Sequence, residues 1–160
     1  MSGAAAGTKP SPESWGSLLE ASAREVFTMM LHCELKELPE NDSGPTPGIT
    51  SMVGLAGSLS GIIAVRTSLK GAAVMAEKMI GAKLAENDPQ CWDAAGEVAN
   101  MISGNFKNKL NTHDEQCMLS VPTVIAGDSY TLHPLGASPE VCMKLSFDDN
   151  PLVLTLDIEQ

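Results

Sequence analysis

Glu97 and Asn100 are side chains of types that can act together on a reacting group. They stand three residues apart, so on a helix they project side by side into the same volume. A carboxylate and a carboxamide offer hydrogen-bond acceptors and a neutral donor, which suits holding a water molecule and a cation. The pair cannot hold a metal ion alone, contains no nucleophile with its base, and has no histidine at helical spacing. On a convex surface without a pocket, it suits action on another protein better than on a small molecule.

The sequence around this pair predicts a helix over residues 88–110. Asn87-Asp88-Pro89 supplies an N-cap side chain followed by proline at the first helical position. Apolar residues at helical spacing define its core face, namely Cys91, Ala95, Val98, Ile102 and Phe106. A polar stripe on the opposite side is expected to face solvent and consists of Asp93, Glu97, Asn100 and Gly104.

This polar stripe is poorly suited to an ordinary exposed helix. Gly104 costs about 1 kcal/mol relative to alanine, and asparagine is also a weak helix former. Asp93 and Glu97 are like charges at i,i+4, which destabilises a helix by a few tenths of a kcal/mol. Such departures from local consistency are where function is sought. Ordinary surface drift, with Gly96 and Gly104 admitting close packing, explains the pattern equally well.

The other segments predict an α/β (α+β) fold, with a mostly antiparallel sheet packed against helices. Helical periodicity covers residues 14–36 and 70–80, and Gly81 can cap the second of these helices. A β-hairpin is expected from residues 49–56 and 61–68, joined by small residues. Further strands are expected at residues 117–125, 140–147 and 152–158, with a short one at 130–135.

The two long helical segments resemble each other. Residues 23–30 match residues 95–102 at four of eight positions, at an offset of 72 residues. If this is an internal repeat, the chain consists of two related helix-plus-strands halves that share one sheet. Chance similarity between two amphipathic helices explains the match about as well.

Length and composition limit the classes of function. The chain has 160 residues, enough for one domain, and its 20 acidic against 10 basic residues give a formal charge of −10. This charge argues against nucleic acid and anionic membranes as partners. Scarce aromatic residues and nine methionines predict an aliphatic, methionine-rich core.

Compartment and boundaries follow from the cysteines and the N-terminal residues. With no signal peptide and no long apolar run, we expect a cytoplasmic protein whose four cysteines are thiols rather than disulfides. Residues 1–12 are expected to be a flexible tail, and residues 13–160 the single domain.

The segment from Asp93 to Gly104 resembles the D/S-x3-E-x2-N-x3-G signature of the CheC/CheX/FliY chemotaxis phosphatases. The text GEVANMISGNFK and the order of elements are similar to the CheX branch, and the likeness covers roughly residues 14–158. CheC-like members carry two copies of the signature. Here the first helix has Glu25 but Thr28 in place of the asparagine and Ala21 in place of the aspartate, so one intact site remains, as in CheX.

The resemblance implies a phosphatase for the phosphoaspartate of a CheY-type receiver domain. By this analogy Asn100 orients the attacking water and Glu97 pairs with the receiver's active-site lysine, which makes these two residues the catalytic candidates. The receiver supplies Mg²⁺, so the chain needs no cofactor or metal of its own. The residues we assign to partner binding are Asp93, Gly96, Gly104 and Lys107.

The resemblance also implies a homodimer formed through sheet edges, for which an unpaired strand within residues 140–158 is the candidate. Two alternatives to a phosphatase stay open. The same fold could bind a receiver or a coupling protein without catalysis, and a small-molecule enzyme is the more distant alternative. A pure binding module has no need of an asparagine in the middle of a helix, which favours the phosphatase.

Overall fold

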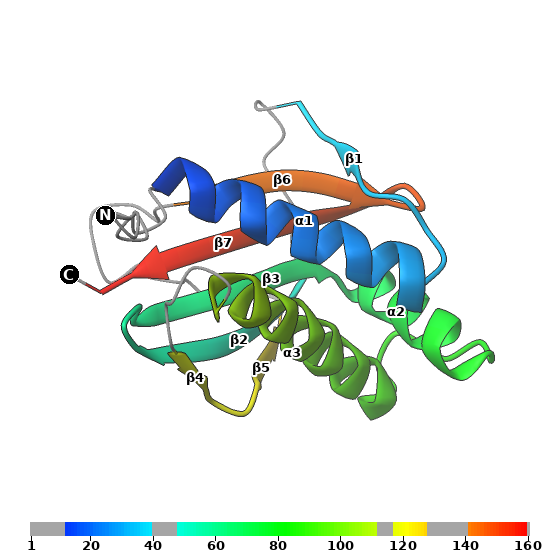
Figure 1. The fold of residues 1–160 in the computed structure, drawn as a ribbon. Coiled ribbons are helices and arrows are strands. Elements are labelled where there is room, and N and C mark those ends of the chain that lie inside the picture. Colours follow the sequence, from blue (N-terminus) through cyan, green and yellow to red (C-terminus); the bar gives the residue numbers. More distant parts are fainter. Residues whose placement is uncertain (1–11, 40–47, 112–116, 128–140, 160) are drawn as a thin grey trace, which may run out of the picture.

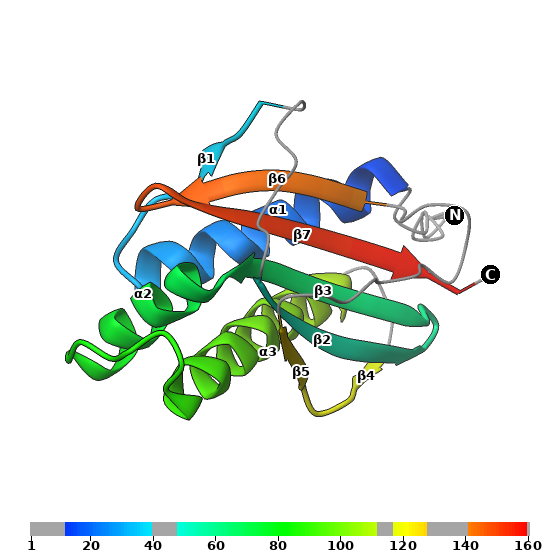
Figure 2. The same cartoon turned by 180° about the vertical axis from the view of Figure 1, so that it is seen from behind.

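In the described residues, seven strands form one antiparallel sheet and three helices cover one of its faces (Figure 1). The computed structural model describes residues 12–39, 48–111, 117–127 and 141–159. The helices are α1 (Pro12–Met30), α2 (Leu69–Ile80) and α3 (Pro89–Asn111). The strands are β1 (Lys36–Glu37), β2 (Gly48–Gly57), β3 (Gly61–Ser68), β4 (Cys117–Leu119), β5 (Thr123–Gly127), β6 (Val141–Phe147) and β7 (Asn150–Ile158). Viewed from behind, the ribbon of the described chain leaves the other sheet face without a helix (Figure 2).

The strand order confirms the internal repeat. The sheet runs β1-β6-β7-β3-β2-β4, and β5 also pairs with β2. The hairpins β2–β3 and β6–β7 meet at the centre through β3 and β7. The strand that follows α1 pairs with the second hairpin, and the two strands that follow α3 pair with the first. Exchanging the halves leaves this order unchanged, and α1 and α3 run antiparallel beside each other (Figures 1 and 2).

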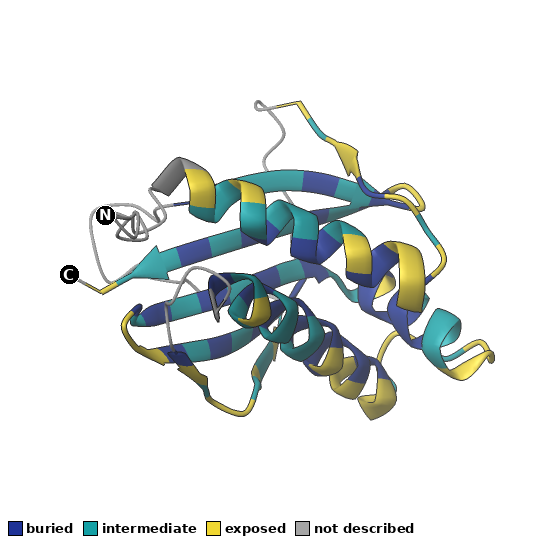
Figure 3. Ribbon diagram, viewed as in Figure 1, coloured by how far each residue is buried: buried dark blue, intermediate teal, exposed yellow. Residues whose placement is uncertain are grey.

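The core lies between the helices and the covered sheet face, where buried residues alternate with more exposed ones along the central strands β3 and β7 (Figure 3). Its centre is aromatic as well as aliphatic, because Phe27, Phe106 and Phe147 are all fully buried. The rings of Phe27 and Phe147 lie 5.0 Å apart at a tilt of 55°. The expected methionine-rich core is wrong, since Met75 is the one methionine buried among the described residues. Met79, Met101 and Met143 pack against the edge of the core and are only partly buried.

Helices α1 and α2 each end close to a residue with a left-handed backbone conformation. Helix α1 stops at Met30, six residues before the predicted end, because His32 adopts a left-handed conformation with φ 52°. The backbone N–H of Cys33 then donates to the carbonyl of Phe27 at 3.0 Å, which pairs one of the last carbonyls of the helix. Helix α2 matches its prediction within one residue, and Gly81 caps it at φ 84°, donating to Glu77 at 2.7 Å.

The hairpin β2–β3 confirms its prediction, but the single strand expected over residues 117–125 is two strands. Pro122 has no N–H to donate to a sheet, so β4 ends at Leu119 and β5 begins at Thr123. Between them Ser120 holds the chain to Gly54 of β2: its N–H donates to the Gly54 carbonyl at 2.9 Å, and its hydroxyl accepts from the Gly54 N–H at 2.8 Å.

The last two strands form a hairpin with a two-residue turn. Asp148 and Asp149 both have positive φ, at 45° and 62°, which the primed turns of β-hairpins require. The Asn150 amide donates to the Asp148 carbonyl at 2.9 Å. Residues 130–135, where a short strand was expected, lie outside the described residues, as do residues 1–11 of the expected tail; Pro12 already belongs to α1.

Replacing Gly61 by alanine should lower the free energy of unfolding by about 2 kcal/mol. A Cβ atom at this buried position would lie against the carbonyl oxygen of Asp157 on the neighbouring strand β7, and neither backbone can move freely within the sheet. Urea unfolding measures the change. Gly16→Ala is the matched control, since its Cβ would meet the Val141 methyls at an ordinary 3.8 Å. Equal stability of the two variants would contradict this account of the β3–β7 contact.

Candidate functional site on helix α3

Helix α3 begins as the sequence predicts. The side chain of Asp88 accepts a hydrogen bond from the backbone N–H of Gln90 at 2.9 Å, and Pro89 is the first helical residue. The predicted core face is confirmed, with Cys91, Ala95, Val98, Ile102 and Phe106 all buried against the sheet and the other helices. With that face buried, the opposite face of the helix is left to solvent.

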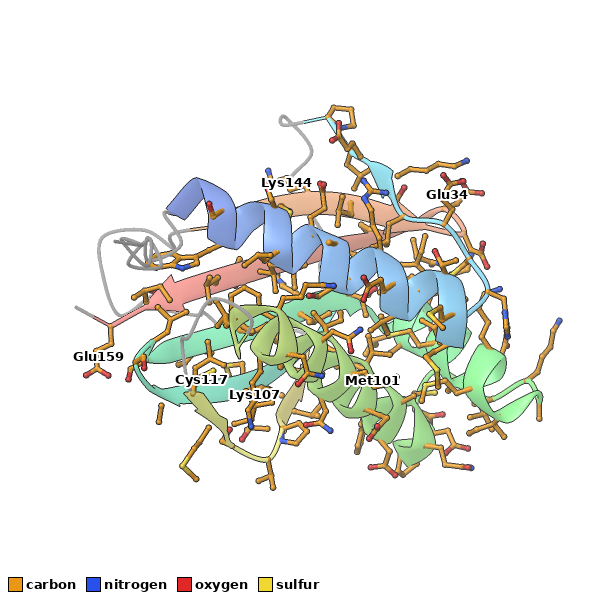
Figure 4. All side chains as sticks on the ribbon, viewed as in Figure 1. Glu34, Met101, Lys107, Cys117, Lys144 and Glu159 are labelled. Atoms are coloured by element: carbon orange, nitrogen blue, oxygen red, sulfur yellow. The ribbon has the colours of Figure 1, made fainter. Side chains whose placement is uncertain are left out.

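The polar stripe lies on that opposite face. Asp93 and Glu97 are exposed, and Asn100 and Gly104 are partly exposed. A Cβ atom added at Gly104 would find no heavy atom within 4 Å, so the space beside this glycine is open. The Glu97 carboxylate and the Asn100 carboxamide are therefore accessible to a large partner, with an unobstructed surface one turn further along the helix (Figure 4, where Met101 and Lys107 mark the same helix).

Two of the predicted partner-binding residues, Lys107 and Gly96, are not part of the polar stripe, and they differ in exposure. Lys107 is partly exposed, one turn beyond Gly104. Gly96 is buried: a Cβ there would lie 3.1 Å from the Val124 Cγ2 and 3.7 Å from the Pro122 Cβ. This corrects the expectation that Gly96 contacts a partner directly. The missing side chain instead lets β5, and the turn that precedes it, pack closely against α3.

Glu25 on α1, which corresponds to Glu97 in the repeat, contacts the neighbouring helix α3 within the same chain. Glu25 accepts a hydrogen bond from Lys109 Nζ at 2.8 Å and one from Asn105 Nδ2 at 3.5 Å, so its carboxylate ties α1 to α3. Sequence reasoning identified Glu25 as half of a degenerate signature but not this contact, which depends on how the helices pack. Thr28 stands exposed where α3 has Asn100.

The cysteines are thiols, as expected, but they are not all packed: Cys91 and Cys117 are buried, Cys33 is partly buried and Cys142 is exposed. None of the four forms a disulfide, and the Cys91 thiol donates to the Ala85 carbonyl at 3.4 Å. Burial raises the pKa of Cys33 and of Cys91, which keeps both thiols protonated near neutral pH. Within the described residues, no three His, Cys, Asp or Glu side chains come together as metal ligands.

A cavity of about 400 Å³ lies away from α3, along strand β6. It is lined by Glu20, Glu37, Leu38, Cys142, Met143, Lys144 and Leu145. None of these residues belongs to α3, so the polar stripe does not line this cavity. In the part of the chain that the structure describes, no helix is both long enough and apolar enough to cross a membrane.

Comparison with known proteins agrees with this fold and with the position of the stripe. The family model described as "Chemotaxis phosphatase CheX" matches residues 49–146, which include β2 except its first residue, β3, α2 and the whole of α3. Among curated proteins, no sequence matches the chain closely enough to count as a relative.

Several solved structures share the fold. The chemotaxis protein CheX of Vibrio vulnificus is 20% identical, with a TM-score of 0.80, over 93% of this chain and 99% of that one. CheX of Desulfovibrio desulfuricans is 21% identical, with a TM-score of 0.77, over 91% and 99%. CheX in the CheX–CheY–BeF3–Mg²⁺ complex of Borrelia burgdorferi is 23% identical, with a TM-score of 0.75, over 90% and 97%. The family model covers more than half of the chain, and on that ground the chain belongs to the CheX family of chemotaxis phosphatases.

Proposed function

We propose that this chain hydrolyses the phosphoaspartate of a CheY-type receiver domain. The observation that carries the proposal is the pairing of Glu97 with Asn100 on an exposed helix face, beside open space at Gly104. Membership of a phosphatase family supports it, as does the complex of the Borrelia burgdorferi relative with CheY.

In this reaction a water molecule attacks phosphorus in line with the acyl oxygen, and the bond between phosphorus and that oxygen breaks. The products are inorganic phosphate and the free aspartate carboxylate. The receiver's own Mg²⁺ and lysine neutralise the charge on the phosphoryl group. The helper protein then has to position the water and hold the two molecules in register, which can supply a large part of the rate.

The two side chains divide this work. The oxygen of the Asn100 carboxamide can accept a hydrogen bond from the water while its NH2 group donates one to the phosphoryl group, which orients the attacking oxygen. The exposed Glu97 carboxylate pairs with the receiver's lysine, and a charge-assisted hydrogen bond of this kind fixes the docking geometry. Asp93 and Lys107 contact the receiver on either side, and Gly104 admits its surface closely.

A turnover assay tests this function. Phosphorylated CheY-type receivers from the same organism are followed for phosphoryl loss, with and without a substoichiometric amount of this chain. Accelerated loss with several turnovers per molecule supports the proposal. If decay is unchanged while a complex forms, the chain is a non-catalytic binding module for receivers, and the polar stripe is only a docking surface.

We also propose a homodimer formed through β6. In the described part of the chain, no strand pairs with residues 141–143 on the side away from β7, while β1 pairs only with Ser146 and Leu145. An antiparallel pair of β6 strands centred on exposed Cys142 would place the two Cys142 Cα atoms roughly 5 Å apart, within disulfide range.

Mild oxidation should therefore produce a covalent dimer that is absent in Cys142→Ser. Gel electrophoresis without reductant measures the product. Cys33→Ser is the matched control and should leave the cross-link in place, because that thiol lies beyond the end of α1 and is partly buried. A chain that sediments as a monomer at all concentrations would contradict the dimer.

A further inference from the structure

The turn between β4 and β5, residues 120–122, stands beside the polar stripe and carries an unusually exposed apolar side chain. Val121 is 82% exposed, the highest value among the large apolar residues that the structure describes as exposed. Its neighbour Pro122 lies against α3 at Gly96, the residue immediately before Glu97. The turn and the polar stripe therefore form one continuous surface.

Gly96 is what brings the two together. The Val124 Cγ2 would lie only 3.1 Å from a Cβ at this position, which is tighter than most packed contacts, so a larger residue would push the turn away from the helix. Ser120 fixes the other side of the turn through its two hydrogen bonds to Gly54. The turn is held from both sides, and Val121 is presented on a rigid support.

A second apolar side chain lies on the same side of the helix. Trp92 precedes Gly96 by four residues, so the two share one helix face. Its side chain is 39% exposed. We call Trp92, on this helix face, and Val121, in the turn that packs on the same face at Gly96, the apolar flank. Tryptophan is among the residues most enriched where interfaces carry their binding energy.

We propose that this apolar flank, Trp92 and Val121, is the part of the docking surface that sets affinity for the receiver domain, by burying apolar surface against it. The inference rests on the proposed function. A protein interface of standard size buries about 800 Å² on each partner, a patch roughly 30 Å across. A receiver centred on Asn100 with such a footprint covers the turn, because the turn packs on the residue next to Glu97.

If the apolar flank binds the receiver and the polar stripe carries out the reaction, a substitution in the flank should change KM and leave kcat unchanged. Val121→Ser removes apolar contact area without touching the polar stripe, and the side chain is too exposed for its loss to disturb the fold. We expect KM to rise about five- to tenfold with kcat unchanged, since the lost contacts bind substrate and transition state equally. Trp92 is partly buried, so Val121 is the cleaner probe.

Met118→Ser is the matched control. Met118 is 75% exposed and only three residues away, but it lies on the opposite sheet face, since its neighbours Cys117 and Leu119 pack toward the core. Its substitution should leave KM unchanged. An unchanged KM in Val121→Ser, or an equal rise in Met118→Ser, overturns the apolar flank as the affinity determinant.

Binding is measured separately, so that failure of this inference is distinguishable from failure of the proposed function. Each variant is titrated with CheY-type receivers from the same organism, loaded with Mg²⁺ and BeF3⁻ as a stand-in for the phosphoryl group. Val121→Ser should weaken Kd about five- to tenfold whether or not the chain is catalytic. Tight binding without turnover would contradict the phosphatase activity but not the role of the apolar flank in binding. If no receiver binds, both proposals are wrong.

Discussion

Replacing Asn100 by alanine should lower the stimulated rate of receiver dephosphorylation about 100-fold, to near the receiver's own rate of decay. The carboxamide lies on the exposed face of α3 and is the group proposed to orient the attacking water. Without it the water samples many orientations, and the chain provides docking alone. We expect kcat to fall and receiver binding to change little, because Glu97 and the apolar flank are still present.

Asn108→Ala is the matched control for this result. It removes the same side chain from an exposed position on the same side of the helix, about 12 Å further along the helix axis and away from the Glu97–Asn100 pair. Its activity should equal that of the wild type. The assay is single-turnover phosphoryl loss at saturating chain, with receiver binding measured in parallel. Equal rates for wild type and Asn100→Ala would exclude a chemical role for the carboxamide.

A bulky side chain at Gly104 should weaken receiver binding strongly without harming the fold. The space beside this residue is open within the chain, so Gly104→Leu can be built on the helix without internal conflict. In the complex the added side chain would have to displace the receiver's surface. We expect affinity to fall about 100-fold, equivalent to roughly 2.7 kcal/mol, which lies within the usual range for overpacking a closely fitted contact.

Gly104→Ala provides the comparison. Alanine in place of a mid-helix glycine should raise the free energy of unfolding by about 0.5 to 1 kcal/mol, because glycine loses more backbone entropy on folding. Its effect on affinity should be much smaller than that of leucine. Thermal unfolding measures the first quantity, and titration with a BeF3⁻-loaded receiver measures the second. If Gly104→Leu binds as the wild type does, the receiver does not contact this part of the polar stripe.

Much of the molecule could be predicted from the sequence because local patterns determine it. The caps at Asp88 and Gly81 delimit helices through groups only a few residues apart. The core face of α3 follows from its apolar period, and the polar stripe follows as the complement of that face. The hairpin β2–β3 follows from two apolar runs joined by small residues. These features depend on spacing along one element and need no knowledge of its neighbours.

The remaining features depend on contacts between segments far apart in the sequence, and only the tertiary structure decided them. The sequence shows that position 96 is glycine, but it does not show what the missing side chain permits. Only the fold shows that Val124 packs there, 3.1 Å from where a Cβ atom would stand. Glu25 reads as a surface carboxylate until the packing of α1 on α3 brings Lys109 within 2.8 Å. The exposure of Val121 likewise depends on Pro122 interrupting a predicted strand and on Ser120 bonding to β2. Periodicity along one element shows which face is buried, whereas the element packed against that face is selected by the whole fold.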